Sequence, residues 1–373
     1  MVKKYRVEKR TWKNNQTLYI LRRKDTEQIN ERATKYLKHK MMQNCSENTT
    51  KAIAHSLCYY YNFLSVENLS VEDVLLMDYA EQHAHFVSFL MWLKKGGHTN
   101  NEKSPNNKTC NIHLEKVFGF YDFLEKEYED LDGKIKVLQN KKIEYYSSVG
   151  VSLSKEVKSF SGYFKAEPSR SRTITEEEFN VLLQACKGIR DKLILLILRE
   201  TGFRIGELLG VKYTEDIDFD HECIRVYARE GNPNHARAKN AEFRNIRIRP
   251  ETFDILTHYM SQYQEILNKT EYLFVIQKGP ETGKPMNYSD ICSLFARLYK
   301  RTGIRANPHM LRHLFAKTLY KAGMPLLEIS HLLGHKNIQT TIMYIDIEKE
   351  EMAEDLLKMY ASKEALLNID ELL

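Results

Sequence analysis

Apolar residues recur at helical spacing through most of the first half of the chain, from about residue 26 to residue 146. The segments 47–64, 78–94 and 111–128 each place large aliphatic and aromatic side chains three and four positions apart, which gives each helix one apolar face. The stretch 96–107 is rich in Asn and Gly and is expected to be a loop. This pattern predicts a compact helical domain at 41–150, and alone it indicates no function.

The pattern changes in the second half of the chain. Residues 151–172 lose periodicity and gather Ser, Gly and Lys, so we expect a linker there. Thr175 with Glu178 three positions later is a capping box that opens a second domain at 173–347. Helical spacing predicts helices at 176–185, 190–200, 204–209, 251–267, 288–302, 309–322, 325–333 and 338–345. Alternating residues around Ile224 and Ile246 predict a small β-hairpin. The expected fold class is therefore mainly α with a small β-sheet: a helical domain followed by a mixed α/β domain.

Composition narrows the class of protein. The chain has 373 residues, 42% of them hydrophobic, which is enough for two packed domains. Its six cysteines form no C-x-x-C pair, which argues against a zinc ribbon or a disulfide scaffold and favours a reducing compartment. The N-terminus lacks the apolar region of a signal peptide, and no run of eighteen apolar residues occurs. We expect a cytoplasmic protein with no membrane contact.

Positive charge is unevenly distributed. The formal net charge is +6, yet the first 24 residues hold nine Lys or Arg and one acid. Residues 1–40 are therefore a candidate basic arm that contacts DNA phosphates, although a poorly ordered terminus or a small hairpin fits as well. The segment 225–249 holds seven basic residues and two acids, which suits either a solvated hairpin or one that lies in a DNA groove. The candidate DNA-binding residues are Arg170, Arg172, Arg225, Arg237, Arg244 and Arg247.

The richest chemistry lies between residues 309 and 344. His309, Arg312 and His313 fall on one face of a predicted helix, whereas Leu311 and Phe315 face a core. Gly334 is placed to end the next helix, and it leaves His335 at the start of a turn. A short helix then carries Tyr344. Two imidazoles, a guanidinium and a phenol suit attack on a phosphodiester.

Metal binding is a weaker interpretation of the same histidines. A metalloprotease motif needs Glu directly after the first His, and Met310 occupies that position. We therefore expect no metal and no cofactor. Two further candidates lie upstream. Arg204 is followed three residues later by Glu207, which could hold its guanidinium, and Lys239 is the sole lysine between Lys212 and Lys269.

Together these motifs resemble the tyrosine recombinases, the phage-integrase family. The match runs from about residue 173 to 347, nearly half of the chain. It rests on Thr-Gly-x-Arg-Ile-x-Glu-Leu around Arg204, His-x-Leu-Arg-His at 309–313, Leu-Gly-His at 333–335, and a tyrosine nine residues after His335. Residues 45–150 match only as a helical domain of the size of the family's core-binding domain.

The resemblance implies a role for each residue. Arg204 and Arg312 would bind the non-bridging oxygens of the scissile phosphate, with His335 and His309 adding hydrogen bonds. Tyr344 would attack and form a 3′-phosphotyrosine, His309 could take its proton, and Lys239 would protonate the departing 5′-oxygen. Glu207 and His313 would be supports. Neither ATP nor a metal is needed, because the ester keeps the bond energy.

The resemblance also implies partners. Residues 348–373 hold eight acids and three bases together with an amphipathic face, so this tail suits docking on a neighbouring protomer in a DNA-bound tetramer, although self-packing is the simpler alternative. The expected substrate is double-stranded DNA at specific sites, with an accessory DNA-bending factor as a possible partner and the nucleoid as the place of action. The expected function is an integrase or transposase of a mobile element. The alternatives are a type IB topoisomerase, a Xer-type recombinase that resolves chromosome dimers, and a DNA-binding protein with an inactive site.

Overall fold

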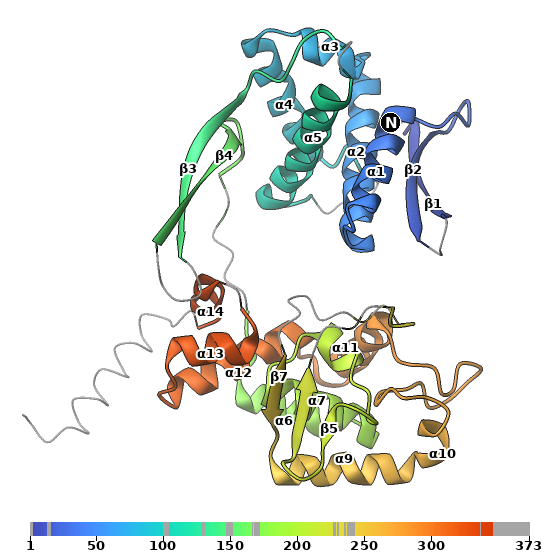
Figure 1. The fold of residues 1–373 in the computed structure, drawn as a ribbon, viewed down its shortest axis with the longest axis vertical. Coiled ribbons are helices and arrows are strands. Elements are labelled where there is room, and N and C mark those ends of the chain that lie inside the picture. Colours follow the sequence, from blue (N-terminus) through green and yellow to red (C-terminus); the bar gives the residue numbers. More distant parts are fainter. Residues whose placement is uncertain are drawn as a thin grey trace, which may run out of the picture. The chain divides into compact units, whose positions relative to one another are not determined.

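A computed structural model shows a largely helical protein, and the part of the chain that it describes holds three small sheets of two, two and three strands, so the expected fold class is confirmed (Figure 1). The structure describes residues 3–12, 16–99, 104–128, 131–146, 152–165, 167, 172–226, 229, 231–234, 236, 243–335 and 337–345. Within these ranges no helix has the length and apolar character that a membrane crossing requires.

The chain divides into two compact units, each with its own hydrophobic core. The first unit comprises Met1–Ile143 and Lys155–Arg170, and the second comprises Glu144–Ser154 and Ser171–Leu373. The elements up to the hairpin shared by the two units are β1 (Tyr5–Thr11), β2 (Thr17–Arg23), α1 (Glu31–Met42), α2 (Glu47–Glu67), α3 (Val71–Leu76), α4 (Tyr79–Lys94), α5 (Asn107–Glu127), β3 (Leu138–Tyr146) and β4 (Ser152–Phe160).

The core of the first unit lies between α1, α2, α4 and α5 and is rich in aromatic residues. Each of these helices begins with a polar N-cap whose side chain accepts a hydrogen bond from the first turn, as Ser46 does from the Thr49 amide at the start of α2. Helix α2 ends at Asn68, which adopts φ +54°. The apolar periodicity of the sequence therefore corresponds to real buried faces.

The N-terminal segment forms a β-hairpin, one of the structures expected for residues 1–40. Strands β1 and β2 pair antiparallel, and Tyr19 and Leu21 of β2 are buried in the core of the first unit. The other face of β2 is buried too, against Met41 of α1. Several basic side chains of the hairpin pair with acids, including Lys9 with Glu47. Both faces of β2 are apolar, so both have to be covered in the folded chain.

The linker is shorter than the segment 151–172 predicted from the sequence. Strand β4 occupies Ser152–Phe160, and Phe160 is buried in the core of the first unit. Most of the preceding strand residues are exposed. A strand that is exposed on both faces carries no apolar alternation, so the sequence pattern did not reveal it.

The second unit is built around α7, whose residues 193–198 are all buried. Its elements are α6 (Glu176–Gln184), α7 (Ile189–Thr201), α8 (Ile205–Leu209), β5 (Ile217–Asp218), β6 (Cys223–Val226), β7 (Arg244–Arg247), α9 (Pro250–Gln262), α10 (Gln264–Leu267), α11 (Tyr288–Thr302), α12 (Pro308–Lys321), α13 (Leu326–Leu333) and α14 (Ile338–Tyr344). The predicted hairpin is present with Ile224 opposite Ile246, and β5 adds a third strand that the sequence did not suggest. The helix predicted at 251–267 is divided into α9 and α10 at Tyr263.

Two glycines shape the turns beside the candidate site. Gly202 ends α7 at φ +60°, and a β-carbon there would lie 2.4 Å from Cδ1 of Phe315. Gly334 ends α13 at φ +62°. Both positions need the left-handed conformation that glycine adopts without strain. Helix α12 packs against α7 and α13, and α14 packs against α13, so these turns meet beside α12.

Candidate active site

Arg204 and Glu207 form the first part of the site at the start of α8. Arg204 is the N-cap of this helix, and its amide donates to Oε2 of Glu207 over 2.8 Å. Its Nη1 donates to Oε1 of the same carboxylate over 2.9 Å. The guanidinium also donates to the carbonyls of Leu333 and Gly334. A capping interaction therefore fixes Arg204 against the turn after α13.

Arg312 lies at the centre of the site, and its side chain is only 1% exposed. From α12 it donates to the carbonyls of Gly202 and Leu333, and its Nη2 lies 2.9 Å from Nε2 of His335. Burial, followed by the charge of Arg204, lowers the pKa of Arg312 to about 10. The guanidinium thus stays protonated at neutral pH, and its contacts link α7, α12 and α13.

His335 is held in one tautomer by its two partners. Because Arg312 donates to Nε2, the ring proton belongs on Nδ1, which donates to the Thr341 hydroxyl over 2.8 Å. Burial, with the nearby arginines second, lowers the pKa of His335 to about 3. The imidazole is therefore neutral at physiological pH. Thr341 belongs to α14, so this hydrogen bond also positions the helix that ends in Tyr344.

Tyr344 lies among three histidines. Its hydroxyl is 3.3 Å from both ring nitrogens of His309, and its ring stacks on His313 with centroids 3.8 Å apart. The ring of His335 meets the phenol ring edge-on at 4.9 Å. Burial lowers the pKa of His309, and it lowers that of His313 to about 4. A neutral His309 has a lone pair that can accept the phenolic proton.

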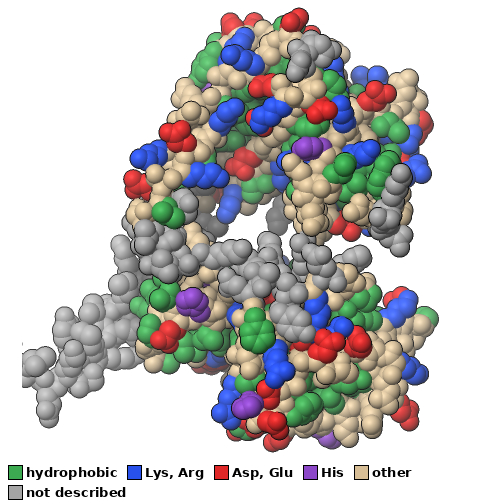
Figure 2. Space-filling view, viewed as in Figure 1, with side chains coloured by type: hydrophobic (Ala, Val, Ile, Leu, Met, Phe, Trp, Pro, Cys, Tyr) green, Lys and Arg blue, Asp and Glu red, His purple; other side chains and the backbone are tan. Residues whose placement is uncertain are grey.

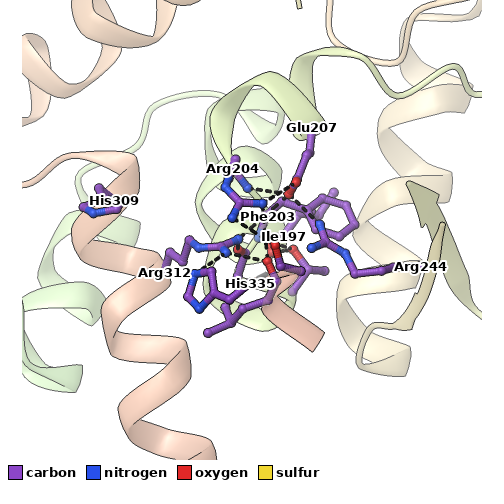
Figure 3. A network of polar contacts seen from close by, with 12 residues as sticks. Ile197, Phe203, Arg204, Glu207, Arg244, His309, Arg312 and His335 are labelled. Carbon is purple, nitrogen blue, oxygen red and sulfur yellow. Dashed lines mark hydrogen bonds and ion pairs between the residues drawn. The ribbon is translucent and has the colours of Figure 1, made fainter. Parts of the chain in front are cut away.

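The structure therefore brings together most of the residues singled out in the sequence. Figure 3 shows Arg204, Glu207, Arg312 and His335 converging from α8, α12 and the turn after α13, with His309 on α12 nearby. Lys239, Arg237 and Arg170 lie outside the described residues.

Arg244 requires a correction. The sequence suggested a DNA-facing side chain, yet its guanidinium is 8% exposed and pairs with Oε2 of Glu207 at 2.6 Å. Arg244 is therefore part of the buried centre rather than of an open basic surface. Strand alternation could have indicated this, because Arg244 shares a face of β7 with the buried Ile246. Thr341 was missed as well, and no sequence signal marked it.

The other DNA-binding candidates within the described residues are Arg172, Arg225 and Arg247, which lie at the surface. Each is paired with one acid, as Arg247 is with Glu222 at 2.9 Å. On the face that Figure 2 shows, basic and acidic side chains are interspersed. Within the described ranges, no three His, Cys, Asp or Glu side chains are grouped so as to hold a metal ion.

Comparisons with known proteins find similar sequences and structures. Residues 172–351 match the Phage integrase family. Transposase A from transposon Tn554 of Staphylococcus aureus is 29% identical over 359 residues, which cover 93% of this chain and 95% of the transposase.

Two solved structures share the fold. The XerH site-specific recombinase bound to palindromic difH substrate has a TM-score of 0.60 at 17% identity, over 88% of each chain. The Tn1549 transposon integrase in complex with transposon right end DNA has a TM-score of 0.58 at 17% identity, over 89% of this chain and 99% of the integrase.

Proposed function

We propose that the chain is a tyrosine-type site-specific recombinase, which its similarity to the Phage integrase family and to a transposase supports, and that it cuts and rejoins DNA through a covalent phosphotyrosine formed by Tyr344. One observation carries this proposal. The Tyr344 hydroxyl lies within reach of a neutral imidazole, and two arginines whose charges can bind a phosphate lie in the same centre. A phenol, a proton acceptor and paired guanidiniums are the parts that phosphodiester transesterification needs.

The arginines overcome the main obstacle to this reaction. The negative oxygens of a phosphodiester repel an incoming nucleophile. Arg204 and Arg312 present forked, permanently charged donors from fixed positions, so they stabilise the charge that builds up on these oxygens in the transition state. His335 adds an imidazole that Thr341 holds in place.

The proposed cleavage step is balanced without any other reactant. The Tyr344 oxygen bonds to phosphorus as its proton passes to His309, and the bond from phosphorus to the 5′-oxygen breaks. The departing oxygen takes a proton from Lys239, the general acid that the resemblance to the family implies. The reverse step, with the 5′-hydroxyl of another strand as the nucleophile, joins that strand and releases Tyr344.

The proposed substrate is DNA at the ends of a mobile element, which makes the enzyme an integrase or transposase. The similarity to a transposase along 93% of the chain supports this choice over chromosome dimer resolution. The helical first unit and the arginines Arg172, Arg225 and Arg247 are proposed to contact the duplex. The segment 348–373, outside the described residues, is proposed to dock on a neighbouring protomer of a tetramer.

A denaturing gel tests the nucleophile. The substrate is a duplex with the protein's own recombination site, nicked so that the cleaved fragment diffuses away, and the buffer contains EDTA. We expect a covalent adduct from the wild type and from Tyr320→Phe, which alters an exposed tyrosine of α12, but none from Tyr344→Phe. An adduct from Tyr344→Phe would refute the assignment. The absence of any adduct on a verified site would favour a DNA-binding protein with an inactive site.

A type IB topoisomerase would perform similar chemistry, so a second assay separates the two enzymes. A recombinase needs two defined sites and exchanges strands between them. A topoisomerase relaxes supercoiled DNA that carries no such site. We expect strand exchange between two sites and no relaxation of a plasmid that lacks them.

A further inference from the structure

The buried centre contains more positive than negative charge. Glu207, whose side chain is 3% exposed, pairs with Arg204 and Arg244 and lies 3.9 Å from Nη1 of Arg312. Three guanidiniums thus share one carboxylate, which leaves an excess of two positive charges among these four residues. The lowered pKa of His335 means that it adds no further charge at neutral pH. Such an excess is unfavourable in a buried site unless an anion joins it.

Arg244 lies at a specific place in this centre. Figure 3 shows its side chain reaching in from β7 towards Glu207. A β-carbon on Gly334 would lie 1.9 Å from Nη1 of Arg244, so the guanidinium packs directly against the residue before His335. The Nε atoms of Arg244 and Arg312 are buried and form no hydrogen bond within the described part of the chain. Arg244 therefore contacts both the carboxylate that holds Arg204 and the turn that presents His335.

We propose that Arg244 is a positioning residue for DNA cleavage, acting as a third guanidinium that shares Glu207 with Arg204 and matches the charge of the centre to that of the transition state. This inference rests on the proposed function. A phosphodiester carries one negative charge, and the pentavalent transition state carries two. With Arg244 the four residues carry two excess positive charges, and without it the remaining three carry one. A reaction is accelerated when the charge of the site stabilises the transition state more than it stabilises the bound DNA.

The competing explanation is that Arg244 and Glu207 form a purely structural ion pair. A substrate of different charge distinguishes these two explanations. Replacing one non-bridging oxygen with a methyl group gives a methylphosphonate, whose transition state carries one negative charge fewer. If Arg244 acts through charge, its loss matters much less on this substrate. If its loss only deforms the site, both substrates are slowed alike.

The experiment uses the full chain and single-turnover formation of the covalent adduct on the nicked duplex, with a phosphodiester or a methylphosphonate at the scissile position. Arg244→Gln keeps most of the buried volume and removes the charge. Arg297→Gln is the matched control, because it makes the same substitution at an exposed arginine of α11 that pairs with Asp191 and has no proposed role in binding DNA. We expect Arg244→Gln to slow cleavage of the phosphodiester by about 100-fold, the size of losing one oxyanion donor, and to slow cleavage of the methylphosphonate far less. Arg297→Gln should cleave like the wild type.

Equal slowing of both substrates by Arg244→Gln, or wild-type rates on both, would overturn the inference and leave the proposed function intact. If the wild type itself formed no adduct, the proposed function would fail and the inference with it. A second variant guards against misfolding. In Arg244→Ala a space remains that free guanidinium ion can enter, so millimolar guanidinium should restore cleavage in this variant and not in Tyr344→Phe. Failure of that rescue in folded Arg244→Ala would contradict the role.

Discussion

The two units each contain a buried polar network, and the two networks differ in charge. In the first unit, the Tyr60 hydroxyl lies 2.9 Å from Nε2 of His85 and 2.6 Å from the Tyr121 hydroxyl. Burial lowers the pKa of His85 to about 4 and raises those of both tyrosines, so all three groups are neutral. In the second unit, the network around Glu207 and Arg312 is charged and has buried donors without partners among the described residues.

This difference separates a structural network from one that is arranged for a ligand. Neutral groups that satisfy one another can be buried at little cost, and they fix the packing of α2, α4 and α5. Like charges held together in a protein interior lower its stability, and such arrangements are typical of functional sites.

The largest effect is expected from Glu207→Gln. Loss of the carboxylate leaves three guanidiniums without their shared anion, so the second unit should lose roughly 3–5 kcal/mol of stability. Sulfate should restore more stability to this variant than to the wild type, because it supplies the missing negative charge. Both tryptophans, Trp12 and Trp92, belong to the first unit, so their fluorescence should follow an unchanged transition while far-UV circular dichroism shows the loss. A shift of the fluorescence transition would contradict the assignment to the second unit.

The next effect concerns catalysis. Arg312→Lys keeps the positive charge but removes the fork that joins His335 to the carbonyl of Leu333. We expect covalent adduct formation to slow by about 100- to 1,000-fold, corresponding to roughly 3–4 kcal/mol of transition-state stabilisation. DNA affinity, measured by fluorescence anisotropy with Tyr344→Phe as the reference, should change little. A variant that cleaves at the wild-type rate would show that charge alone suffices.

Glu207 and Arg312 illustrate how much of the site can be predicted from the sequence. The motif spacings predicted a helix face with His309 and Arg312 and a turn with His335, because helical periodicity and glycine caps are local properties. The sharing of Glu207 among three arginines depends on how α8, β7 and α12 pack, and no local pattern encodes it.

Prediction of the fold from the sequence has the same limit, because local patterns do not encode contacts between distant segments. Long amphipathic helices such as α2 and α11 were predicted close to their observed ends, because one apolar face sets each of them. The sequence is compatible with both the hairpin β1–β2 and a disordered arm, and it gives no sign of the exposed strand β4. In both cases the strand is stabilised by contacts distant in sequence, as in the packing of Phe160 on the core of the first unit.

The stability of both units should depend on pH, and an anion should change this dependence in the second unit only. His85 and His335 have folded pKa values of about 4 and about 3, below their ordinary value of 6.5. The unfolded chain therefore binds more protons below pH 6.5, and stability falls as the pH drops from 6.5 towards 4, by up to about 1.4 kcal/mol per pH unit for each histidine. Sulfate beside Arg312 favours protonated His335, so it should flatten this dependence in the second unit.

Urea unfolding at pH 7 and pH 5 measures this difference. Tryptophan fluorescence reports the first unit, and the remaining circular dichroism change reports the second. His335→Gln should remove the sulfate effect, whereas His85→Gln should weaken only the pH dependence of the fluorescence transition. Equal flattening of both transitions by sulfate would show that the anion acts on the whole chain rather than at the candidate site.

The smallest effect is expected from Tyr121→Phe in the neutral network. The ring keeps its place in the core, and the Tyr60 hydroxyl keeps its partner His85, so no buried group loses all of its partners. The first unit should therefore lose only about 1 kcal/mol, seen as a small shift of the tryptophan transition. Tyr60→Phe should cost more, because it removes a partner from both His85 and Tyr121. Neither substitution should change the rate of adduct formation on the nicked duplex. If Tyr121→Phe slowed cleavage as strongly as Arg312→Lys does, the two networks would be coupled, and the distinction between a structural and a ligand-binding network would fail.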